Sequence, residues 1–426
     1  MALSAITRTV GVRGLSLLAA FLLSTTAART LGPAPAGAFF LVYTLLALLA
    51  TIGRFGTDNL ALRLLGGDTR SARTDALQLM PIASVAGAIA AVAGWGLINF
   101  YVGQEVGIVS VLLVASCIVA QTLSVLCGTI LRGLGKLASG VFAELGSMPM
   151  IATLIIAGSQ FLFPETTSLR GALLALVAAS WTTTGWALPL TLVLVRKRLT
   201  DTVSETPRGT AFIRLHAHRL APMMGTSLLA YGTVWAPVFI LSATSALSEV
   251  SYYSIAARLA SMIAIIPTIQ ISYLAPEFAR RFYTGDLRGL NSLAGRSTLF
   301  VAAATIVPLL ILLSLSYQVV HFLFGDSFLA ATPIVIILCC ASFVVLLFGQ
   351  VNQLMLLCEL EKTALLLTLS AMAAWTTIGI WAGAHSGAVG IAWIAAGINV
   401  AYAGSGAFAL RQLRGIRSYV GRIGTA

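Results

Sequence analysis

Two ionisable side chains lie within long apolar stretches of this sequence. A charge there is energetically costly, so such residues are candidates for a function. Arg258 follows Glu249 by nine residues, which puts it ~13 Å along a helix, near the midplane of a membrane. Glu144 follows Lys136 by eight residues, ~12 Å along its own helix. A guanidinium binds phosphate through two parallel hydrogen bonds and stays charged when desolvated, so Arg258 suits an anionic diphosphate. Glu144 has three interpretations: a coupling group, a packing or hydrogen-bonding residue, or a partner that neutralises Arg258.

No pattern typical of an enzyme accompanies these two residues. The sequence lacks the G-x-x-x-x-G-K-[ST] loop that binds ATP phosphates. A membrane-embedded sugar transferase or polymerase needs paired carboxylates, but the acids Glu105, Glu165, Glu249 and Asp326 come one per short connection. The five cysteines show no C-x-x-C spacing. We therefore expect no catalytic residue, no metal and no cofactor, and a transferase is the least favoured class.

The residues that must position these groups are mostly apolar. Of the 426 residues, 58% are hydrophobic and 9% charged, against roughly 25% charged in an ordinary soluble domain, so a soluble globule is excluded. At ~20 residues per span, twelve spans need ~240 residues, close to the apolar content. The apolar runs are 11–28, 34–53, 76–101, 107–131, 138–163, 171–195, 220–244, 250–275, 297–324, 329–353, 363–384 and 387–410. They predict an all-α polytopic membrane protein with about twelve transmembrane helices.

Lysine and arginine gather on one side of these predicted spans. Of the 26 basic residues, all except Arg29, Arg170 and Arg258 fall in alternate connections or the two terminal segments. Basic residues mark the cytoplasmic side, so both termini are predicted to be cytoplasmic and the number of spans even. Topology and attraction to anionic membrane lipids thus explain the net charge of +12, and no nucleic-acid partner is expected.

The sequence repeats itself at about half its length. AGAFFLVYTLLALLATIG leads into a segment ending Gly67-Asp68, and EVSYYSIAARLASMIAIIP leads into one ending Gly285-Asp286. The expected organisation is a six-helix lobe at 1–195, a cytoplasmic linker at 196–219, a six-helix lobe at 220–410 and a cytoplasmic tail at 411–426. Parallel repeats of this kind form two lobes around a central cavity, and their rocking gives alternating access.

Four segments carry a family resemblance. R-T-L-G-P-A-P-A-G-A-F at 29–39 and I-G-R-F-G-T-D-N-L-A-L-R at 52–63 resemble the opening of bacterial polysaccharide exporters of the O-antigen flippase type. Y-S-I-A-A-R-L at 253–259 and F-G-D-S-F-L-A-A at 324–331 are similar to the second half of that family. The family belongs to the multidrug, oligosaccharidyl-lipid and polysaccharide exporter superfamily.

The resemblance implies a flippase that moves an undecaprenyl-diphosphate-linked oligosaccharide across the bacterial inner membrane. Carried over by position, Arg29, Arg54 and Arg258 are its substrate-binding candidates, and polysaccharide-assembly proteins are its expected partners. Related lipid II flippases usually have fourteen spans and more cavity arginines, which disfavours lipid II as cargo. The alternative is a drug or metabolite antiporter of the same fold, for which Glu144 is the candidate carboxylate of the first lobe.

Overall fold

The chain is almost entirely helical in the computed structural model, which describes residues 2–66, 71–162, 168–196 and 210–419. No strand occurs in these ranges. The Gly67-Asp68 pair of the repeat, Glu165, most of the predicted linker 196–219 and the tail beyond residue 419 lie outside the described residues.

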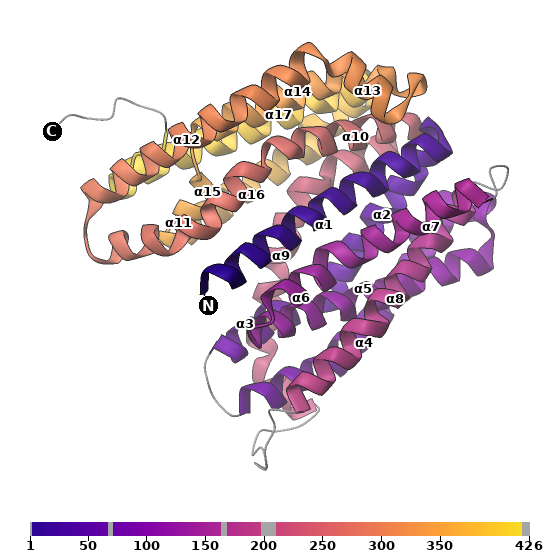
Figure 1. Cartoon of the computed structure of the whole chain (residues 1–426), viewed down its shortest axis with the longest axis horizontal. Helices are drawn as coiled ribbons and strands as arrows, with labels where there is room; N and C mark the ends of the chain where they lie inside the picture. Colours follow the sequence, from indigo (N-terminus) through magenta and orange to yellow (C-terminus); the bar gives the residue numbers. More distant parts are fainter. Residues whose placement is uncertain (1, 67–70, 163–167, 197–209, 420–426) are drawn as a thin grey trace. The chain divides into compact units, whose positions relative to one another are not determined.

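The contacts within the chain divide it into two units, Met1–Tyr231 and Gly232–Ala426. The helices of unit 1 (Figure 1) are α1 (Ala2–Leu31), α2 (Pro33–Arg54), α3 (Thr57–Gly66), α4 (Ser71–Val106), α5 (Ile108–Gly133), α6 (Leu137–Val141), the π-helical turn η1 (Phe142–Gly146), α7 (Ser147–Leu162) and α8 (Leu169–Arg196). Helix α9 (Thr210–Thr244) contains the boundary between the units. The helices of unit 2 are α10 (Leu247–Ile263), α11 (Ile265–Tyr283), α12 (Leu287–Ser314), α13 (Ser316–Phe324), the 3₁₀ turn η3 (Asp326–Ala331), α14 (Thr332–Leu347), α15 (Val351–Leu357), α16 (Glu361–Ala374), the π-helical turn η4 (Trp375–Gly379) and α17 (Ile380–Arg414).

The described helices account for about twelve membrane spans. Nine are long and apolar enough to cross a membrane, or up to 11 if each of two bent helix pairs forms one span. One of the nine, Glu361–Arg414, is 54 residues long and contains a non-helical residue, Gly387, at φ 55° and ψ −147°. Divided at Gly387, it gives the two spans predicted at 363–384 and 387–410. The prediction of an all-α polytopic membrane protein with about twelve helices is confirmed.

A side chain from another helix caps the span that begins after Gly387. Glu249, in the first turn of α10, accepts a hydrogen bond from the Ala388 backbone N–H at 2.8 Å. A carboxylate in this position satisfies a free donor and interacts favourably with the helix dipole. This acid, which the sequence places in a short connection, therefore ties the start of α10 to the start of the last span.

The predicted cytoplasmic connection 276–296 is mostly helical. Helix α11 continues to Tyr283 and α12 begins at Leu287, because charged side chains support the helix ends. Glu277 pairs with Arg280 and Arg281 at 2.7 Å, and these hydrogen bonds, that of Arg280 foremost, lower the pKa of Glu277 to about 2. Asp286 caps α12 by accepting from the Gly289 N–H at 2.8 Å.

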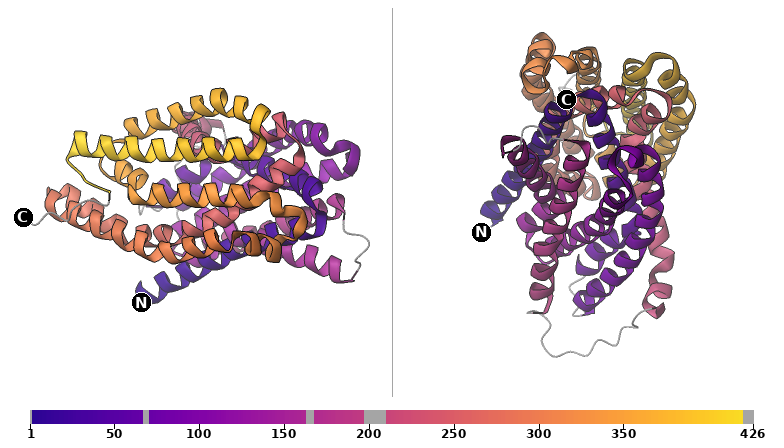
Figure 2. Two further views of the ribbon diagram at one scale, coloured as in Figure 1. Left: turned by 90° about the horizontal axis from the view of Figure 1, so that it is seen from above. Right: turned by 90° about the vertical axis from the view of Figure 1, so that its right-hand side faces the viewer.

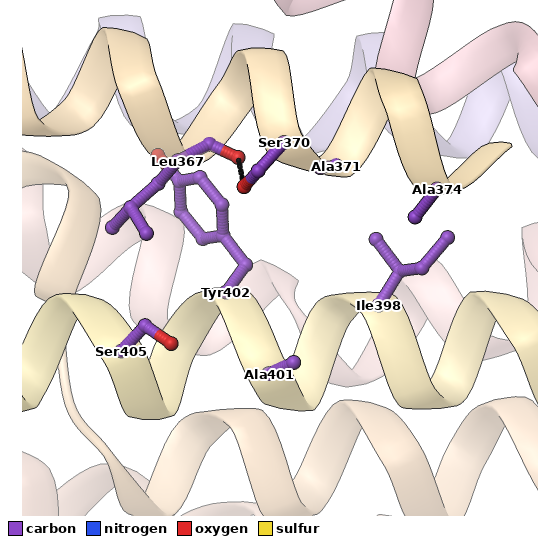
Figure 3. Close-up of a pocket in the computed structure, with 8 residues that line it drawn as sticks. All are labelled: Leu367, Ser370, Ala371, Ala374, Ile398, Ala401, Tyr402 and Ser405. Atoms are coloured by element: carbon purple, nitrogen blue, oxygen red, sulfur yellow. Dashed lines mark hydrogen bonds between the residues drawn. The ribbon is translucent and has the colours of Figure 1, made fainter. Parts of the chain in front are cut away.

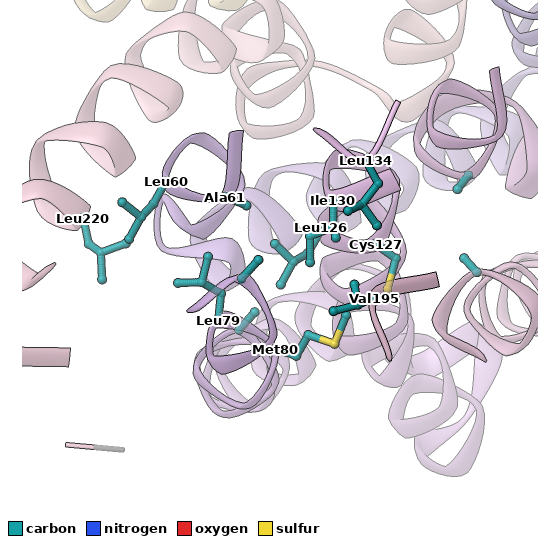
Figure 4. Close-up of a cluster of buried hydrophobic side chains, with 14 residues drawn as sticks. Leu60, Ala61, Leu79, Met80, Leu126, Cys127, Ile130, Leu134, Val195 and Leu220 are labelled. Atoms are coloured by element: carbon teal, nitrogen blue, oxygen red, sulfur yellow. The ribbon is translucent and has the colours of Figure 1, made fainter. Parts of the chain in front are cut away.

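Each unit has its own apolar core. In unit 1, α5 contacts α2, α4 and α8, and the buried cluster in Figure 4 includes side chains from α3, α4, α5 and α8: Leu60, Leu79, Ile130 and Val195. In unit 2, α17 runs beside α14 and α16 (Figure 2). A second cluster there includes Ile416, a residue of the predicted tail. Helix positions in both units are thus fixed by burial on one face.

Candidate functional site

Arg54 is buried at the end of α2 with its charge matched. Its side chain is only 6% exposed, and its Nε donates to Asp58 Oδ2 at 3.0 Å. Its Nη2 donates to the Thr51 hydroxyl at 2.9 Å. The guanidinium therefore has partners on both the preceding and the following turn of chain.

A tight turn places Asp58 beside Arg54. Phe55 and Gly56 both have positive φ, 48° and 75°, which ends α2 and starts α3 two residues later. The Thr57 hydroxyl donates to the Arg54 carbonyl at 2.6 Å and holds this reversal. A methyl group on Gly56 would lie 2.7 Å from the Leu220 carbonyl oxygen, so only glycine fits. The sequence R-F-G-T-D thus builds the ion pair locally.

Glu144 forms an ion pair within unit 1. Its Oε2 lies 3.0 Å from Arg132 Nη2, and the two side chains are 21% and 29% exposed. Glu144 belongs to the π-helical turn η1, and single π-helical turns within α-helices are frequent at functional sites. One of the three interpretations paired Glu144 with Arg258, and its ion-pair partner within unit 1 is Arg132.

Two glycines allow this pair to form. Helices α5 and α6 approach so closely that a methyl group on Gly128 would lie 2.7 Å from the Gly140 carbonyl oxygen. A methyl on Gly140 would lie 2.6 Å from Arg132 Cγ, so the Arg132 stem passes directly over Gly140. The guanidinium then reaches Glu144, one helical turn further along the chain.

These two ion pairs belong to one group of charges. Arg13, Arg54, Asp58 and Arg132 all interact electrostatically with Glu144. We call these five residues the five-charge cluster. It holds three guanidinium groups and two carboxylates, and Arg132 Nε is buried without a hydrogen-bond partner in the described part of the chain. Arg54–Asp58 and Arg132–Glu144 balance each other and Arg13 is exposed, so the feature of the cluster that suits an anionic oxygen is the unused Arg132 Nε.

Arg29 lies far from Arg54. Arg29 is exposed in the last turn of α1, just before α2, while Arg54 is the last residue of α2. The 22 residues of α2 span ~33 Å at 1.5 Å per residue. One diphosphate cannot contact both arginines, although the sequence patterns group them.

Arg258 lies in α10 of unit 2. Its side chain is half-buried, and its carbonyl accepts from the Ser261 hydroxyl at 2.7 Å. Of the four predicted site residues, Arg54 and Glu144 meet in the five-charge cluster, while Arg29 lies at the other end of α2. Reasoning from sequence missed Arg132, which was counted as a topological charge. The available signal was the glycine that precedes each partner by four residues, Gly128 before Arg132 and Gly140 before Glu144.

Unit 2 also contains a cavity of about 210 Å³ between α16 and α17. Figure 3 shows the side chains that line it: Leu367, Ser370, Ala371, Ala374, Ile398, Ala401, Tyr402 and Ser405. None of these is charged, and the Ser370 hydroxyl is already bonded to the Leu367 carbonyl at 2.8 Å. The lining does not supply the cationic groups that a diphosphate requires.

The fold is shared with known membrane transporters. No family model and no curated protein matches the sequence. Among solved structures, the chain is similar to the lipid II flippase MurJ in an inward closed conformation, with TM-score 0.71 and 12% identity over 96% of this chain and 88% of that one. It is similar to an inward-facing MATE family multidrug resistance transporter of the MOP superfamily, with TM-score 0.65 and 13% identity over 93% and 96%. A mutant of the Vibrio cholerae MATE transporter VcmN gives TM-score 0.62 and 14% identity over 98% of both chains.

These likenesses, together with the apolar helices, define the class. The chain is a multi-pass, all-helical membrane protein with the fold that lipid II flippase and MATE transporters share.

Proposed function

We propose that this chain is a transporter that moves an undecaprenyl-diphosphate-linked oligosaccharide across the bacterial inner membrane by alternating access. The observation that carries the proposal is the buried, unused Arg132 Nε, in a cluster of three guanidinium groups and two carboxylates of which Arg13 is exposed. A site for a cationic drug needs the opposite balance. The fold shared with a lipid II flippase supports a lipid-linked cargo.

The three candidate arginines suit successive stages of such a movement. Arg54 and Arg29 lie at opposite ends of α2, which the distribution of basic residues predicts to be its cytoplasmic and external ends. Arg258 lies within a span of unit 2. We propose that the diphosphate first approaches the five-charge cluster that contains Arg54, then binds Arg258 within the membrane and meets Arg29 on release. With the cytoplasm negative, outward movement releases ~2.3 kcal/mol per charge per 100 mV, so no ATP is required.

Substitutions at Arg258 test the binding role. Arg258→Ala should abolish flipping of the lipid-linked oligosaccharide in reconstituted vesicles, while Arg258→Lys should keep part of it, because a point charge replaces a two-pronged donor. Arg288→Ala is the matched control, since Arg288 is exposed at the start of α12. Normal flipping by an Arg258→Ala protein of normal abundance would leave Arg258 without a binding role.

The second candidate function is a drug or metabolite antiporter. Two observations favour it: the fold shared with MATE transporters, and a carboxylate, Glu144, in a π-helical turn of unit 1. If Glu144 couples transport to an ion, Glu144→Gln should reduce transport and remove its pH dependence. We favour a structural role, because Glu144 already has Arg132 as a partner, and then transport should change little once protein abundance is corrected.

The membrane orientation is part of the proposal. Both termini are cytoplasmic, residues 196–219 join two superposable lobes, and membrane lipids and polysaccharide-assembly proteins are the expected partners. A reporter fused after Arg422 should give a cytoplasmic signal. A periplasmic signal there would overturn both the orientation and the even number of spans.

A further inference from the structure

The chain that follows α17 folds back onto unit 2. Helix α17 ends at Arg414, and Gly415 adopts a left-handed conformation with φ 68° and ψ 17°. Ile416 N–H then returns to the Leu410 carbonyl at 3.1 Å, which closes the helix end. Ile416 and Ser418 are fully buried, while Arg417 between them is exposed. We call Gly415–Tyr419 the C-terminal segment.

One amide side chain holds the backbone of this segment at two points. Asn291, near the start of α12, donates from Nδ2 to the Gly415 carbonyl at 3.2 Å. Its Oδ1 accepts from the Arg417 N–H at 2.8 Å. Because both bonds go to backbone groups, they fix the path of the segment rather than the identity of its side chains.

The segment ends in a notch where a membrane helix is interrupted. Helices α14 and α15 are separated by Phe348–Gln350, and Gly349 there has φ 84°. The Thr298 hydroxyl lies 2.8 Å from the Ser418 carbonyl oxygen and 2.9 Å from the Ala294 carbonyl oxygen, and its one proton is shared between them. A methyl group on Gly349 would overlap the Ser418 carbonyl oxygen and lie 2.6 Å from Thr298 Oγ1. The Ser418 backbone therefore fills the space left by the missing side chain.

The same interruption is joined to a second broken span. Gln350 Nε2 donates to the Pro267 carbonyl at 3.1 Å, and Pro267 lies just after the 47° bend between α10 and α11. If α14 and α15 became one continuous helix, Gly349 would lose its left-handed backbone and the notch would close. Docking of the C-terminal segment is therefore thermodynamically linked to the equilibrium between the interrupted and the continuous forms of α14–α15.

The segment is short, and it has no helical hydrogen bonds of its own beyond the helix end. Its anchors are the bonds to Asn291 and Thr298, the buried Ile416, and Tyr419, which packs against the same cluster and accepts from the exposed Arg411 at 3.1 Å. The Ser418 hydroxyl is buried without a hydrogen-bond partner among the described residues, which weakens the docked state. Segments with such contacts are the ones that open while the rest of a fold stays intact. We propose that the C-terminal segment is a releasable latch, which holds α14–α15 in its interrupted form until it undocks.

Thiol labelling tests the latch without any transported cargo. In a protein with its five free cysteines replaced by alanine, Ser418→Cys should react with a soluble maleimide at least about tenfold more slowly than the exposed Arg417→Cys, because only the undocked state exposes position 418. Leu410→Cys, buried in α17, reports unfolding of the unit itself. Ser418→Cys should label faster than Leu410→Cys. Equal rates for positions 418 and 410, or for positions 418 and 417, would each overturn the latch.

Two further substitutions test its anchors and its linkage. Asn291→Ala should accelerate labelling at position 418 about tenfold, since two hydrogen bonds to the segment are lost. Gly349→Ala should also accelerate it, because the added methyl occupies the notch. Acceleration by neither substitution, with Leu410→Cys labelling unchanged, would show that the segment is not anchored at these sites.

A disulfide cross-link tests whether release of the C-terminal segment accompanies transport. Of the experiments on the latch, this one alone rests on the proposed function. In the Thr298→Cys/Ser418→Cys protein, a disulfide whose formation is verified by the loss of both free thiols should reduce transport at least about tenfold, reversibly with dithiothreitol, relative to the two single-cysteine proteins, because locking removes the undocked state. If the oxidised protein transports as fast as the same protein after treatment with dithiothreitol, the latch is contradicted. If the reduced protein moves neither lipid-linked oligosaccharide nor drug, the proposed function fails, while the labelling rates still decide the latch.

Discussion

In unit 1 two ion pairs between side chains, Arg54–Asp58 and Arg132–Glu144, lie among the helices with side chains 6–29% exposed, beside neutral contacts such as the Thr184 hydroxyl with the Ala120 carbonyl. In unit 2 the ion pairs lie near helix ends, with side chains 29% and 30% exposed in Arg281–Glu277 and 34% and 55% exposed in Arg414–Glu359. Beside the interrupted helices of unit 2, amide side chains make neutral contacts to backbone carbonyls. Gln350 binds the Pro267 carbonyl and Gln270 the Ser297 carbonyl, both at 3.1 Å.

The difference follows from the helices themselves. Interruptions at Ala264 and Phe348–Gln350 break two spans of unit 2, and Gln350 joins the two breaks through the Pro267 carbonyl. An amide side chain supplies a donor without adding a charge. We infer that the charge pattern of unit 1 is fixed. In unit 2, by contrast, α14–α15 and the C-terminal segment have two available arrangements, docked and undocked.

The largest effect is expected from filling the notch in unit 2. Gly349→Ala adds a methyl that overlaps the Ser418 carbonyl oxygen at a residue with φ 84°, and should lower the free energy of unfolding by about 3 kcal/mol. The matched control is Gly285→Ala, where φ is 74° but nothing lies within 4 Å of the added methyl. It should cost only about 1 kcal/mol. Denaturation in detergent micelles measures both, and equal losses would show that the notch is not closely packed.

Breaking the charge pattern of unit 1 should have the next largest effect. Glu144→Gln leaves Arg132 without its counter-charge and should cost about 2 kcal/mol, less than for a fully buried pair because both side chains retain some exposure. Glu359→Gln, at the exposed pair with Arg414, should cost less than about 1 kcal/mol. Addition of Arg132→Gln to Glu144→Gln should restore part of the loss. If Glu359→Gln proves as costly as Glu144→Gln, the contrast between the units disappears.

A smaller effect is expected at the neutral contacts of unit 2. Gln350→Leu leaves the Pro267 carbonyl without its donor and should lower the free energy of unfolding by about 1 kcal/mol. Gln353→Leu is the control, because Gln353 is exposed on the same short helix, α15. No difference between the two variants would mean that the Pro267 carbonyl finds another donor.

The smallest effect concerns pH and an exposed pair outside the spans. Hydrogen bonds from Arg280 and Arg281 lower the pKa of Glu277 to about 2, from an ordinary value of 4.5. Because the folded-state pKa is the lower one, the stability that Glu277 contributes is present above about pH 4.5 and is lost as the pH falls towards 2. Glu277→Gln should therefore be slightly less stable than the parent at neutral pH, with the difference vanishing near pH 2. A difference that persists at pH 2 would assign the effect to something other than ionisation.

Hydrophobicity and charge distribution were sufficient to predict the all-helical class and the number of spans. Even the division of the 54-residue run Glu361–Arg414 was predicted, because His385 and Ser386 interrupt the apolar pattern beside Gly387. The helical ends beyond the apolar runs were not predicted. They depend on local charge pairs such as Glu277 with Arg281, which hydrophobicity does not register.

The candidate site was only partly accessible from sequence. The cost of a charge in an apolar run singled out Glu144, and the local R-F-G-T-D sequence contains the Arg54 pair. The partner of Glu144 was not predicted, because it depends on how closely α5 and α6 approach at Gly128 and Gly140. The docking of Ile416 and Ser418 was missed for a similar reason, since a space at Gly349 leaves no trace in composition or charge.

We propose above all that this protein transports an anionic lipid-linked cargo and not a cationic drug. The most direct measurement is the rate at which reconstituted protein exposes a labelled undecaprenyl-diphosphate oligosaccharide to an impermeant reagent, with protein-free vesicles and a cationic dye as comparisons. We expect transport of the oligosaccharide, faster when the membrane potential is negative on the side of departure, and none of the dye. Proton-dependent transport of the dye with no movement of the oligosaccharide would contradict the account and favour the antiporter.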